Sequence, residues 1–283
     1  MKGSRVEQKH LYNEKTMIQL SKIESVQNSM VKHAYSLKIP KKSKDLEDFL
    51  CEGFHLVREA LKSGLKNRFI FGTKEAWENA EGKEILALAQ REKVRCFEVT
   101  GNIISYISDT VTPQGILAVV GKMPSQWPAE NYSRVLAVYQ VQDAGNMGTL
   151  FRSAEAFGVQ AVLLTEGCSD PYNPKVVRAS MGSLFRVPFV HGEKWEACQD
   201  WLKQKNFHTY ALAAQAAEPL PKVKFSTPLA FWVGSEGAGL PEALVAACEG
   251  AISIPMTGQV ESLNVGVAAS LALFWAHFQG PVS

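Results

Sequence analysis

Long apolar runs are missing from this sequence. No stretch of about 18 or more apolar residues occurs, which excludes a transmembrane helix. The opening residues, MKGSRVEQKHLYNEK, contain no apolar core of the kind that secretory signals carry, so we expect no signal peptide there. The acidic Glu7 and Glu14 also argue against a mitochondrial transit peptide. These absences predict a cytoplasmic protein.

Cysteine is scarce and scattered. The five cysteines are Cys51, Cys96, Cys168, Cys198 and Cys248, an odd number with no C-x-x-C pair. Neither a disulfide framework nor a zinc ribbon fits this pattern. No cluster of His, Cys and Asp suggests a set of metal ligands either, so we expect no bound metal.

The net charge is only +2, but it is unevenly distributed. Residues 1–44 carry ten Lys and Arg against three Glu, a net charge of +7, and the remaining chain carries twenty basic against twenty-five acidic residues, a net charge of −5. A basic arm before a mildly acidic body is typical both of a segment that binds a polyanion and of a solvated tail. Charge alone leaves both interpretations open.

Length and composition are those of a globular chain with room for two domains. Of the 283 residues, 46% are apolar and 20% are charged. Residues 1–20 show no clear apolar period and predict a mobile basic extension. Residues 21–121 predict a small α/β domain, and residues 122–133, rich in proline and polar side chains, predict a linker. Residues 134–283 predict the second, larger domain.

The first domain is predicted to mix helices with short strands. Helices are expected at residues 23–38, 49–64 and 83–93, and strands at 67–73, 95–100 and 115–121. The helix at 49–64 is predicted from apolar residues at helical spacings, namely Phe49, Phe54, Val57 and Leu61. Gly64 then stands at the expected C-cap.

From residue 134 onward, strands and helices are predicted to alternate regularly. Strands are expected at 134–141, 159–167, 208–214, 229–237 and 251–255, and helices at 149–157, 173–183, 196–205, 241–248 and 263–278. Alternation with strongly apolar strands predicts an α/β fold, in which helices cover both faces of a mainly parallel sheet. Ligands of such sheets bind beyond the carboxyl ends of the strands.

The first unusual loop, QDAGNMG at residues 142–148, stands between a predicted strand and a predicted helix. Small residues before a helix N-terminus leave its backbone amides open to an anion. Arg152 follows Gly148 by one helical turn, so we expect it to face the same pocket. Taken alone, the pattern is more often a sharp turn followed by a surface arginine.

Two further loops follow later strands. GSEGAGL at 234–240 has three glycines, which allow the backbone to approach a flat ligand closely, and Glu236 between them. Its order, G-x-x-G-x-G, departs from the G-x-G-x-x-G of dinucleotide sites, so a Rossmann dehydrogenase is poorly supported. IPMTGQVESLN at 254–264 places Ser262 and Asn264 before the last helix, where both would also serve as helix caps.

Together, in this order and spacing, the three loops resemble the SpoU, or TrmH-like, branch of the SPOUT RNA methyltransferases. The matching motifs are NxGxxxR (Asn146, Gly148, Arg152), GxExxG (Gly234, Glu236, Gly239) and IPMxGxxxSLN (Ile254 to Asn264). NPKVVRASMGSLFRVP, between the first two, matches as well. IESVQNSMVKHAYSL, FLCEGFHLVREAL and TPQGILAVV resemble the family's N-terminal substrate-binding domain, which is related to ribosomal protein L30e. The resemblance covers nearly everything from residue 21 onward.

The resemblance implies a particular fold and cofactor. The last segment of the C-terminal domain would thread a loop and form a deep trefoil knot, a rare exception to the rule that chains are unknotted. S-adenosylmethionine would be held in the knot, largely by backbone groups of the second and third loops. The positions that match its binding residues are Gly234, Ile254, Met256, Gly258 and Leu263. The family works as homodimers packed through this domain, so we expect a homodimer.

The resemblance also implies the chemistry, which is methyl transfer from a sulfonium to a ribose 2′-hydroxyl. The matching catalytic positions are Asn146, Arg152, Glu236, Ser262 and Asn264. Asn146 and Glu236 are expected to hold the Arg152 guanidinium by hydrogen bonds. Because an arginine pKa is about 12 or above, we favour a charge-stabilising or phosphate-binding role over a role as base, and the sequence leaves both open.

RNA is the expected substrate, because the 2′-hydroxyl distinguishes RNA from DNA. The candidate RNA contacts are Lys32, Lys41, Lys42, Lys44, Lys175 and Arg178. An L30e-like domain resembles family members that modify large-subunit rRNA, so 23S-type rRNA is favoured over tRNA; a thiopeptide-resistance rRNA methylase has the same two-domain plan. A non-enzymatic RNA-binding or assembly factor is the alternative of a different class, and the intact motif residues argue against it.

Overall fold

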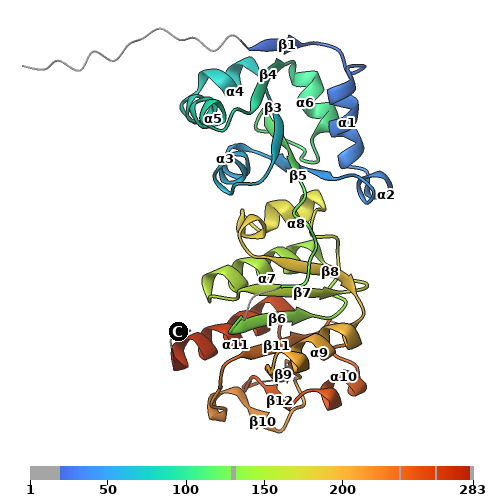
Figure 1. The fold of residues 1–283 in the computed structure, drawn as a ribbon, viewed down its shortest axis with the longest axis vertical. Helices are drawn as coiled ribbons and strands as arrows, with labels where there is room; N and C mark the ends of the chain where they lie inside the picture. The colour runs from blue at the N-terminus through green and yellow to red at the C-terminus, as the bar shows by residue number, and fades with distance from the viewer. Residues whose placement is uncertain (1–19, 129–131, 236, 259, 281–283) are drawn as a thin grey trace, which may run out of the picture.

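The computed structural model describes residues 20–128, 132–235, 237–258 and 260–280, in two halves stacked end to end (Figure 1). The N-terminal half is built around a five-stranded sheet and the C-terminal half around a seven-stranded sheet. Of the predicted extension at 1–20 only Leu20 is described, and residues 129–131 of the predicted linker also lie outside the described residues. Within the described ranges, every helix is too short or too polar to cross a bilayer.

The N-terminal sheet has the strand order β1-β4-β3-β5-β2. Its strands are β1 (Ser21–Ile23), β2 (Asp48–Glu52), β3 (Asn67–Gly72), β4 (Arg95–Val99) and β5 (Ile116–Gly121). The helices are α1 (Ser29–Leu37), α2 (Pro40–Ser43), α3 (Phe54–Lys62), α4 (Lys74–Glu78), α5 (Ala80–Arg91) and α6 (Gly101–Ile107). Apolar residues of α1 and α6 cover one face of the sheet, and those of α3, α4 and α5 cover the other.

Two predicted helices in this half are wrong in their extents. The stretch at 49–64 divides at Gly53, so that β2 precedes a shorter helix, α3. Phe49, Leu50 and Cys51 are all buried because β2 is covered on both faces, so three consecutive positions in the middle of the strand are apolar. Gly53 turns the chain at φ +94°, a conformation that glycine adopts readily. The helix expected at 23–38 is likewise limited to α1.

The C-terminal sheet has the order β10-β12-β9-β11-β6-β7-β8, and all of its pairings are parallel. Its strands are β6 (Arg134–Val138), β7 (Ala161–Thr165), β8 (Phe189–Glu193), β9 (His208–Leu212), β10 (Glu218–Pro219), β11 (Leu229–Val233) and β12 (Gly250–Ser253). The helices are α7 (Ala144–Ala156), α8 (Pro174–Ala179), α9 (Trp195–Gln204), α10 (Glu242–Ala247) and α11 (Val265–Gln279), with 3₁₀ turns η1 (Ser183–Phe185) and η2 (Leu220–Lys222). α7, α8 and α11 cover one face, and α9 and α10 cover the other. The predicted α/β class with a mainly parallel sheet is confirmed, and the knot stays a prediction.

α7 begins earlier than the sequence predicts, which changes the environment of the first loop. Asp143 is the N-cap, and its side chain accepts a hydrogen bond from the Asn146 backbone amide at 2.8 Å. Asn146 and Gly148 therefore lie in the first turns of the helix rather than before it. A Cβ at Gly148 would lie 2.3 Å from the Cβ of Ala179, so the absence of a side chain permits α7 and α8 to pack closely. This packing offsets the cost of about 1 kcal/mol that glycine has in a helix.

The two halves share one apolar core. α8 packs against α7 on one side and against β2 on the other (Figure 1). The ring of Phe49 lies 4.8 Å from that of Tyr172 and 5.9 Å from that of Phe185, measured between centroids. Met123, in the predicted linker, donates its backbone amide to the Tyr172 hydroxyl at 2.8 Å. The N-terminal half thus packs against residues 173–186, which we call the α8–η1 segment.

Candidate active site

A pocket of about 510 Å³ opens at the carboxyl ends of β9, β11 and β12. Its volume lies within the range of small-molecule sites. Four of the five predicted cofactor positions line it, together with one predicted catalytic residue: Gly234, Ile254, Met256, Leu263 and Ser262. The fifth cofactor position, Gly258, is not among the described residues that line it. The structure therefore brings the second and third loops of the sequence into one site.

Gly234 is required by the shape of its own loop. A Cβ at this position would lie 2.3 Å from the carbonyl carbon of Gly239 and 2.7 Å from the amide nitrogen of Leu240. The loop folds back on itself, because the Gly239 amide donates to the carbonyl oxygen of Ser235 at 2.9 Å. The sequence explains this glycine by the approach of a ligand, and the structure adds the approach of the loop's own backbone. Glu236, in the same loop, lies outside the described residues.

Sequence reasoning misses the contribution of β9. Leu212, Ala213 and Gln215, at and beyond its carboxyl end, also line the pocket. β9 pairs with both β11 and β12, so its end lies between the second and third loops. The only signal in the sequence is a strand at 208–214 that ends in small and polar residues. Its neighbours in the sheet cannot be read from the order along the chain.

Beside the pocket, the N-termini of α7 and α11 are joined by two asparagines. Asn264 donates its side-chain amide to the Asn146 side-chain oxygen at 2.8 Å, while its own side-chain oxygen caps α11 by accepting from the amides of Gly266 and Val267. Leu263 and Val265, on either side of Asn264, line the pocket. Two predicted catalytic residues are thereby placed together at the pocket's edge. Asn264 is also the predicted helix cap, and its one side chain makes both the cap and the contact with Asn146.

Small side chains let α7 and α11 lie close along their length. A Cβ at Gly266 would lie 2.9 Å from the Cγ2 of Thr149, and the hydroxyls of Ser153 and Ser270 are 2.6 Å apart. At the opposite ends of the two helices, the buried Arg134 donates to the carbonyl oxygens of Phe157 at 2.5 Å and Ala276 at 3.4 Å. Burial lowers the pKa of Arg134. These contacts fix the position of α11 relative to α7, and with it the positions of the two helix N-termini.

We expect replacements of Asn264 to separate its two hydrogen bonds. Asn264→Ala removes the cap and the contact with Asn146, and should lower the free energy of unfolding by about 1 kcal/mol, measured by urea denaturation. Asn264→Ser keeps a capping hydroxyl but is too short to reach Asn146, so it should lose less stability than the alanine variant. Equal stabilities for Asn264→Ala and the unchanged protein would contradict the capping role.

Arg152 is not hydrogen-bonded to Asn146 or Asn264, which we call the asparagine pair. It lies on α7 with an exposed side chain, and in the described part of the chain its guanidinium has no hydrogen bond or ion pair. The expected hydrogen bond from Asn146 to this guanidinium is not formed, because the Asn146 side chain is bound to Asn264 instead. Among the described residues, none therefore neutralises the charge of Arg152.

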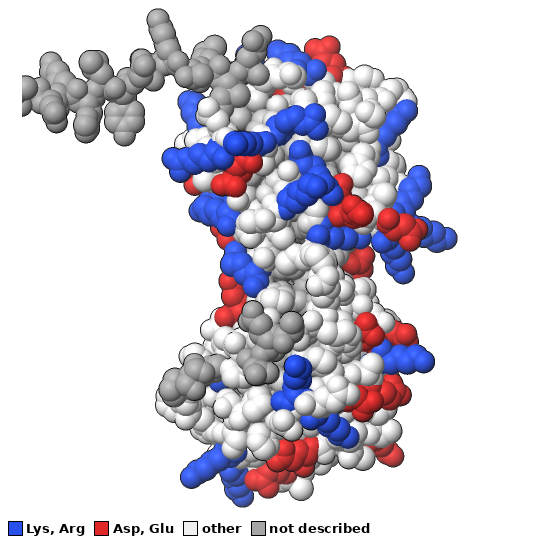
Figure 2. Space-filling model, viewed as in Figure 1, with Lys and Arg blue, Asp and Glu red and all other residues white. Residues whose placement is uncertain are grey.

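The predicted RNA contacts fall into two groups. Lys32, Lys41, Lys42, Lys44 and Lys175 are exposed, and Figure 2 shows lysine and arginine side chains gathered over the N-terminal half of the face in view. Arg178 differs, because it is only partly exposed and forms an ion pair with Asp109 at 2.9 Å. Its guanidinium is thus already engaged by a carboxylate of the N-terminal half.

Thiol and metal chemistry find little support among the described residues. All five cysteines are free. Burial raises the pKa of the Cys96 and Cys198 thiols to about 12 and that of Cys248 to about 11, which disfavours the thiolate at neutral pH. No three His, Cys, Asp or Glu side chains in the described ranges gather as a metal site would require.

Comparison with known proteins gives consistent matches to both halves. Residues 133–274 match the SpoU rRNA Methylase family, and residues 28–118 match the MRM3-like substrate binding domain. The 23S rRNA (guanosine(2553)-2′-O)-methyltransferase RlmP of Bacillus subtilis (strain 168) is 35% identical over 262 residues, which cover 92% of this chain and 100% of that protein.

Solved structures also match over nearly the whole chain. The crystal structure of an rRNA methyltransferase from Sinorhizobium meliloti has 27% sequence identity and a TM-score of 0.80, covering 94% of this chain and 100% of that one. The structure of an AdoMet-bound rRNA methyltransferase from the same organism has 25% identity and a TM-score of 0.81, covering 93% of this chain and 99% of that one.

Proposed function

The chain belongs to the SpoU rRNA methylase family and is an RNA 2′-O-ribose methyltransferase, and from this premise we propose that it methylates a ribose of large-subunit, 23S-type rRNA with S-adenosylmethionine as the methyl donor. The observation that carries the proposal is the pocket at the ends of β9, β11 and β12, beside the linked N-termini of α7 and α11. The B. subtilis relative, whose name specifies 23S rRNA, supports the substrate. We place the reaction in the cytoplasm.

The residues of the pocket fit S-adenosylmethionine. The folded-back loop at 234–240 offers backbone groups to the ligand, and the apolar side chains of Leu240, Ile254 and Leu263 suit an adenine ring. Gln215 and Ser262 add polar groups for a ribose or an amino-acid moiety. When bound, the donor supplies an electrophilic methyl group on a sulfonium.

The protein's own groups act on the ribose. A ribose hydroxyl is a weak nucleophile until its proton leaves, so the site must stabilise the negative charge that develops on the oxygen. Arg152 is suited to this because its positively charged guanidinium is unpaired among the described residues and presents several N–H donors. The asparagine pair holds the N-termini of α7 and α11, whose helix dipoles also favour negative charge nearby. We therefore assign Arg152 the role of charge stabiliser.

The substrate is tested by supplying purified protein with S-adenosylmethionine carrying a labelled methyl group. We expect label in large-subunit rRNA and none in tRNA, and ribose-methylation mapping of rRNA from a deletion strain should show one position that has lost its methyl group. Label confined to tRNA would replace rRNA by tRNA as the substrate. Failure to bind S-adenosylmethionine at all would favour a non-enzymatic RNA-binding factor.

We also propose that the enzyme is a homodimer packed through α11. Val267, Leu271, Phe274 and Phe278 form an exposed apolar stripe on this helix, with exposed fractions of 46%, 40%, 47% and 73%. Residues at these spacings share one helix face, and an apolar face of this kind marks an interaction site. Sedimentation should give about twice the chain mass of 31.1 kDa. Phe274→Glu should yield a monomer, and an unchanged dimer in this variant would place the interface elsewhere.

The exposed lysines around α2 are expected to bind RNA phosphates. Reversing the charges of Lys41, Lys42 and Lys44 should weaken RNA binding and leave S-adenosylmethionine affinity unchanged. For single strands the salt slope is about −0.7 per neutralised phosphate, so three lost contacts should reduce it by about 2.

The matched control reverses three exposed lysines of the C-terminal half, Lys203, Lys222 and Lys224, and should leave the salt slope of RNA binding unchanged. RNA affinity and slope that stay unaltered in the first variant would show that the lysines around α2 are only a solvated surface.

A further inference from the structure

The α8–η1 segment connects the RNA-binding half to the helix that carries the catalytic residues. On one side, Ala179 contacts the backbone of α7 at Gly148, four residues before Arg152. On the other side, α8 packs on β2 of the N-terminal half (Figure 1). The segment also carries two arginines, Arg178 at the end of α8 and Arg186 just after η1, and each reaches a carboxylate of the N-terminal half.

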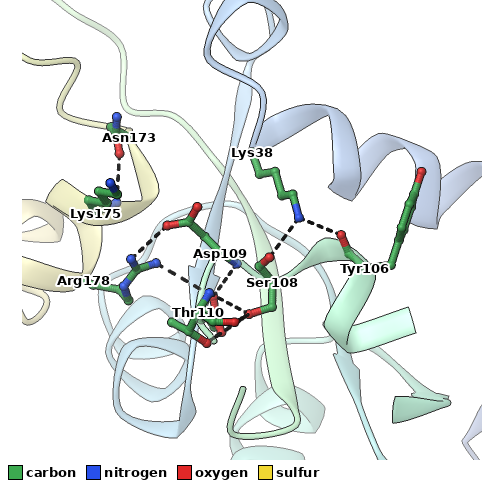
Figure 3. Close-up of polar contacts among 9 residues, drawn as sticks. Lys38, Tyr106, Ser108, Asp109, Thr110, Asn173, Lys175 and Arg178 are labelled. Atoms are coloured by element: carbon green, nitrogen blue, oxygen red, sulfur yellow. Dashed lines mark hydrogen bonds and ion pairs between the residues drawn. The ribbon is translucent and has the colours of Figure 1, made fainter. Parts of the chain in front are cut away.

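Arg178 binds the loop at 108–110 through Asp109 (Figure 3), and Glu52 holds this loop in place. Its Nη2 donates to the Asp109 carboxylate at 2.9 Å, and its Nη1 lies 3.9 Å from the Glu52 carboxylate. The Glu52 side chain, 9% exposed, accepts hydrogen bonds from the Ser108 and Thr110 hydroxyls and from the Asp109 amide. The loop at 108–110 therefore has little freedom to move relative to β2.

The residue that follows α1 also binds this loop. Lys38, just after α1, donates to the carbonyl oxygens of Tyr106 at 2.8 Å and Ser108 at 3.0 Å (Figure 3). The exposed lysines around α2 follow directly after Lys38 in the chain. Polar contacts thus join Lys38, which directly precedes the proposed RNA-binding lysines in the chain, through residues 108–110 to α8.

Arg186 makes a second connection at the other end of the segment. Its Nη1 donates to the Glu59 carboxylate of α3 at 2.6 Å, and its Nε and Nη2 bind both oxygens of Glu155. Glu155 lies on α7, three residues after Arg152, so one guanidinium joins the two halves directly. This contact lowers the pKa of the Glu155 carboxyl, so both partners are charged at neutral pH. A planar guanidinium bound to carboxylates on two elements fixes their relative direction.

We propose that Arg178 and Arg186 are positioning residues, which set the orientation of the RNA-binding half so that the target ribose reaches the methyl-transfer site. The inference rests on the proposed function. Cohesion between the halves comes from the shared apolar core around Phe49, Tyr172 and Phe185. The arginines add direction to that contact, because an apolar interface allows small rotations that charge-assisted hydrogen bonds across it, from Arg178 to Asp109 and from Arg186 to Glu59, resist.

The first experiment compares Arg178→Ala, Asp109→Ala and the double variant in single-turnover methylation of rRNA. A misplacement of about 1 Å can cost about 10²-fold in rate, so we expect each single variant to lose between about 10- and 100-fold in the single-turnover rate constant with little change in RNA affinity. The double variant should lose no more than either single one, because both remove the same contact. Arg178→Lys should recover only part of the rate.

Asp109→Ala separates positioning from direct RNA binding, the role that the sequence predicts for Arg178. Asp109→Ala frees the Arg178 guanidinium. If Arg178 instead binds an RNA phosphate, Asp109→Ala should keep or strengthen both RNA affinity and rate, whereas Arg178→Ala should weaken RNA affinity. That result, or unchanged rates in both variants, would overturn the proposal. Two controls keep this outcome distinct from failure of the proposed function. The unaltered enzyme should methylate rRNA, and every variant should bind S-adenosylmethionine with unchanged affinity.

The second experiment pairs Arg186→Ala with the matched control Arg58→Ala. Arg58 of α3 also binds two carboxylates, Glu81 and Glu84, but both lie in α5 of the same half. Both variants should lose thermal stability to a similar extent, whereas only Arg186→Ala should lower kcat. Equal losses of rate in the two variants, in proportion to their loss of stability, would reduce Arg186 to a structural role and overturn the proposal for it.

Discussion

Arg152→Ala is expected to lower the rate of methyl transfer by about 10²- to 10³-fold while leaving the fold and S-adenosylmethionine binding intact. The side chain is exposed on α7 and makes no hydrogen bond or ion pair with another described residue, so its removal leaves no described polar partner unsatisfied. In the proposed mechanism its positive charge stabilises the ribose oxygen that loses a proton. Single-turnover methylation of rRNA measures the loss, and calorimetry with S-adenosylmethionine tests the binding step separately.

A matched control removes an exposed arginine that is remote from the site. Arg91, at the end of α5 in the N-terminal half, is suitable, and Arg91→Ala should keep the full rate. Turnover of Arg152→Ala near that of Arg91→Ala would remove Arg152 from the mechanism. Retention of activity by Arg152→Lys alone would show that the positive charge matters more than the planar guanidinium.

Gly234→Val is expected to abolish S-adenosylmethionine binding. Even a Cβ at this position would lie 2.3 Å from the Gly239 carbonyl carbon, a distance that the backbone must relieve by moving. The loop from 234 to 240 lines the pocket, so this movement changes the pocket's shape before any ligand arrives. Calorimetric titration with S-adenosylmethionine should give no measurable heat, and an unchanged affinity would show that the donor binds elsewhere.

Gly237→Ala is the control within the same loop. A Cβ at Gly237 meets no other atom within 4 Å, so this variant should keep the melting temperature of the unaltered protein. Gly234→Ala should already show part of the valine effect, because the first carbon of the side chain makes the close contact. An unperturbed Gly234→Ala would contradict the argument from the loop backbone.

The sequence predicts the strongly apolar strands of the C-terminal sheet, among them β6, β7 and β11, but it misreads two other elements. β2 is read as part of a helix because burial on both faces leaves no alternation in its residues. The start of α7 is read as a loop because two glycines and an asparagine normally interrupt helices, whereas close packing against Ala179 accommodates Gly148 there. In both places packing against a distant segment overrides the local preference.

By itself the sequence determined which chemistry-bearing residues follow which strands, that the C-terminal half is a parallel α/β sheet, and which family its motifs resemble. Only the tertiary structure decided which of those residues meet. Asn146 and Asn264 are 118 positions apart and are joined because α7 and α11 pack on the same face of the sheet. β9 lines the pocket because strand order in the sheet differs from order in the chain. Arg178 binds Asp109 rather than remaining unpaired because α8 lies against the N-terminal half. Contacts of this kind join remote segments, and they depend on packing that no local sequence pattern encodes.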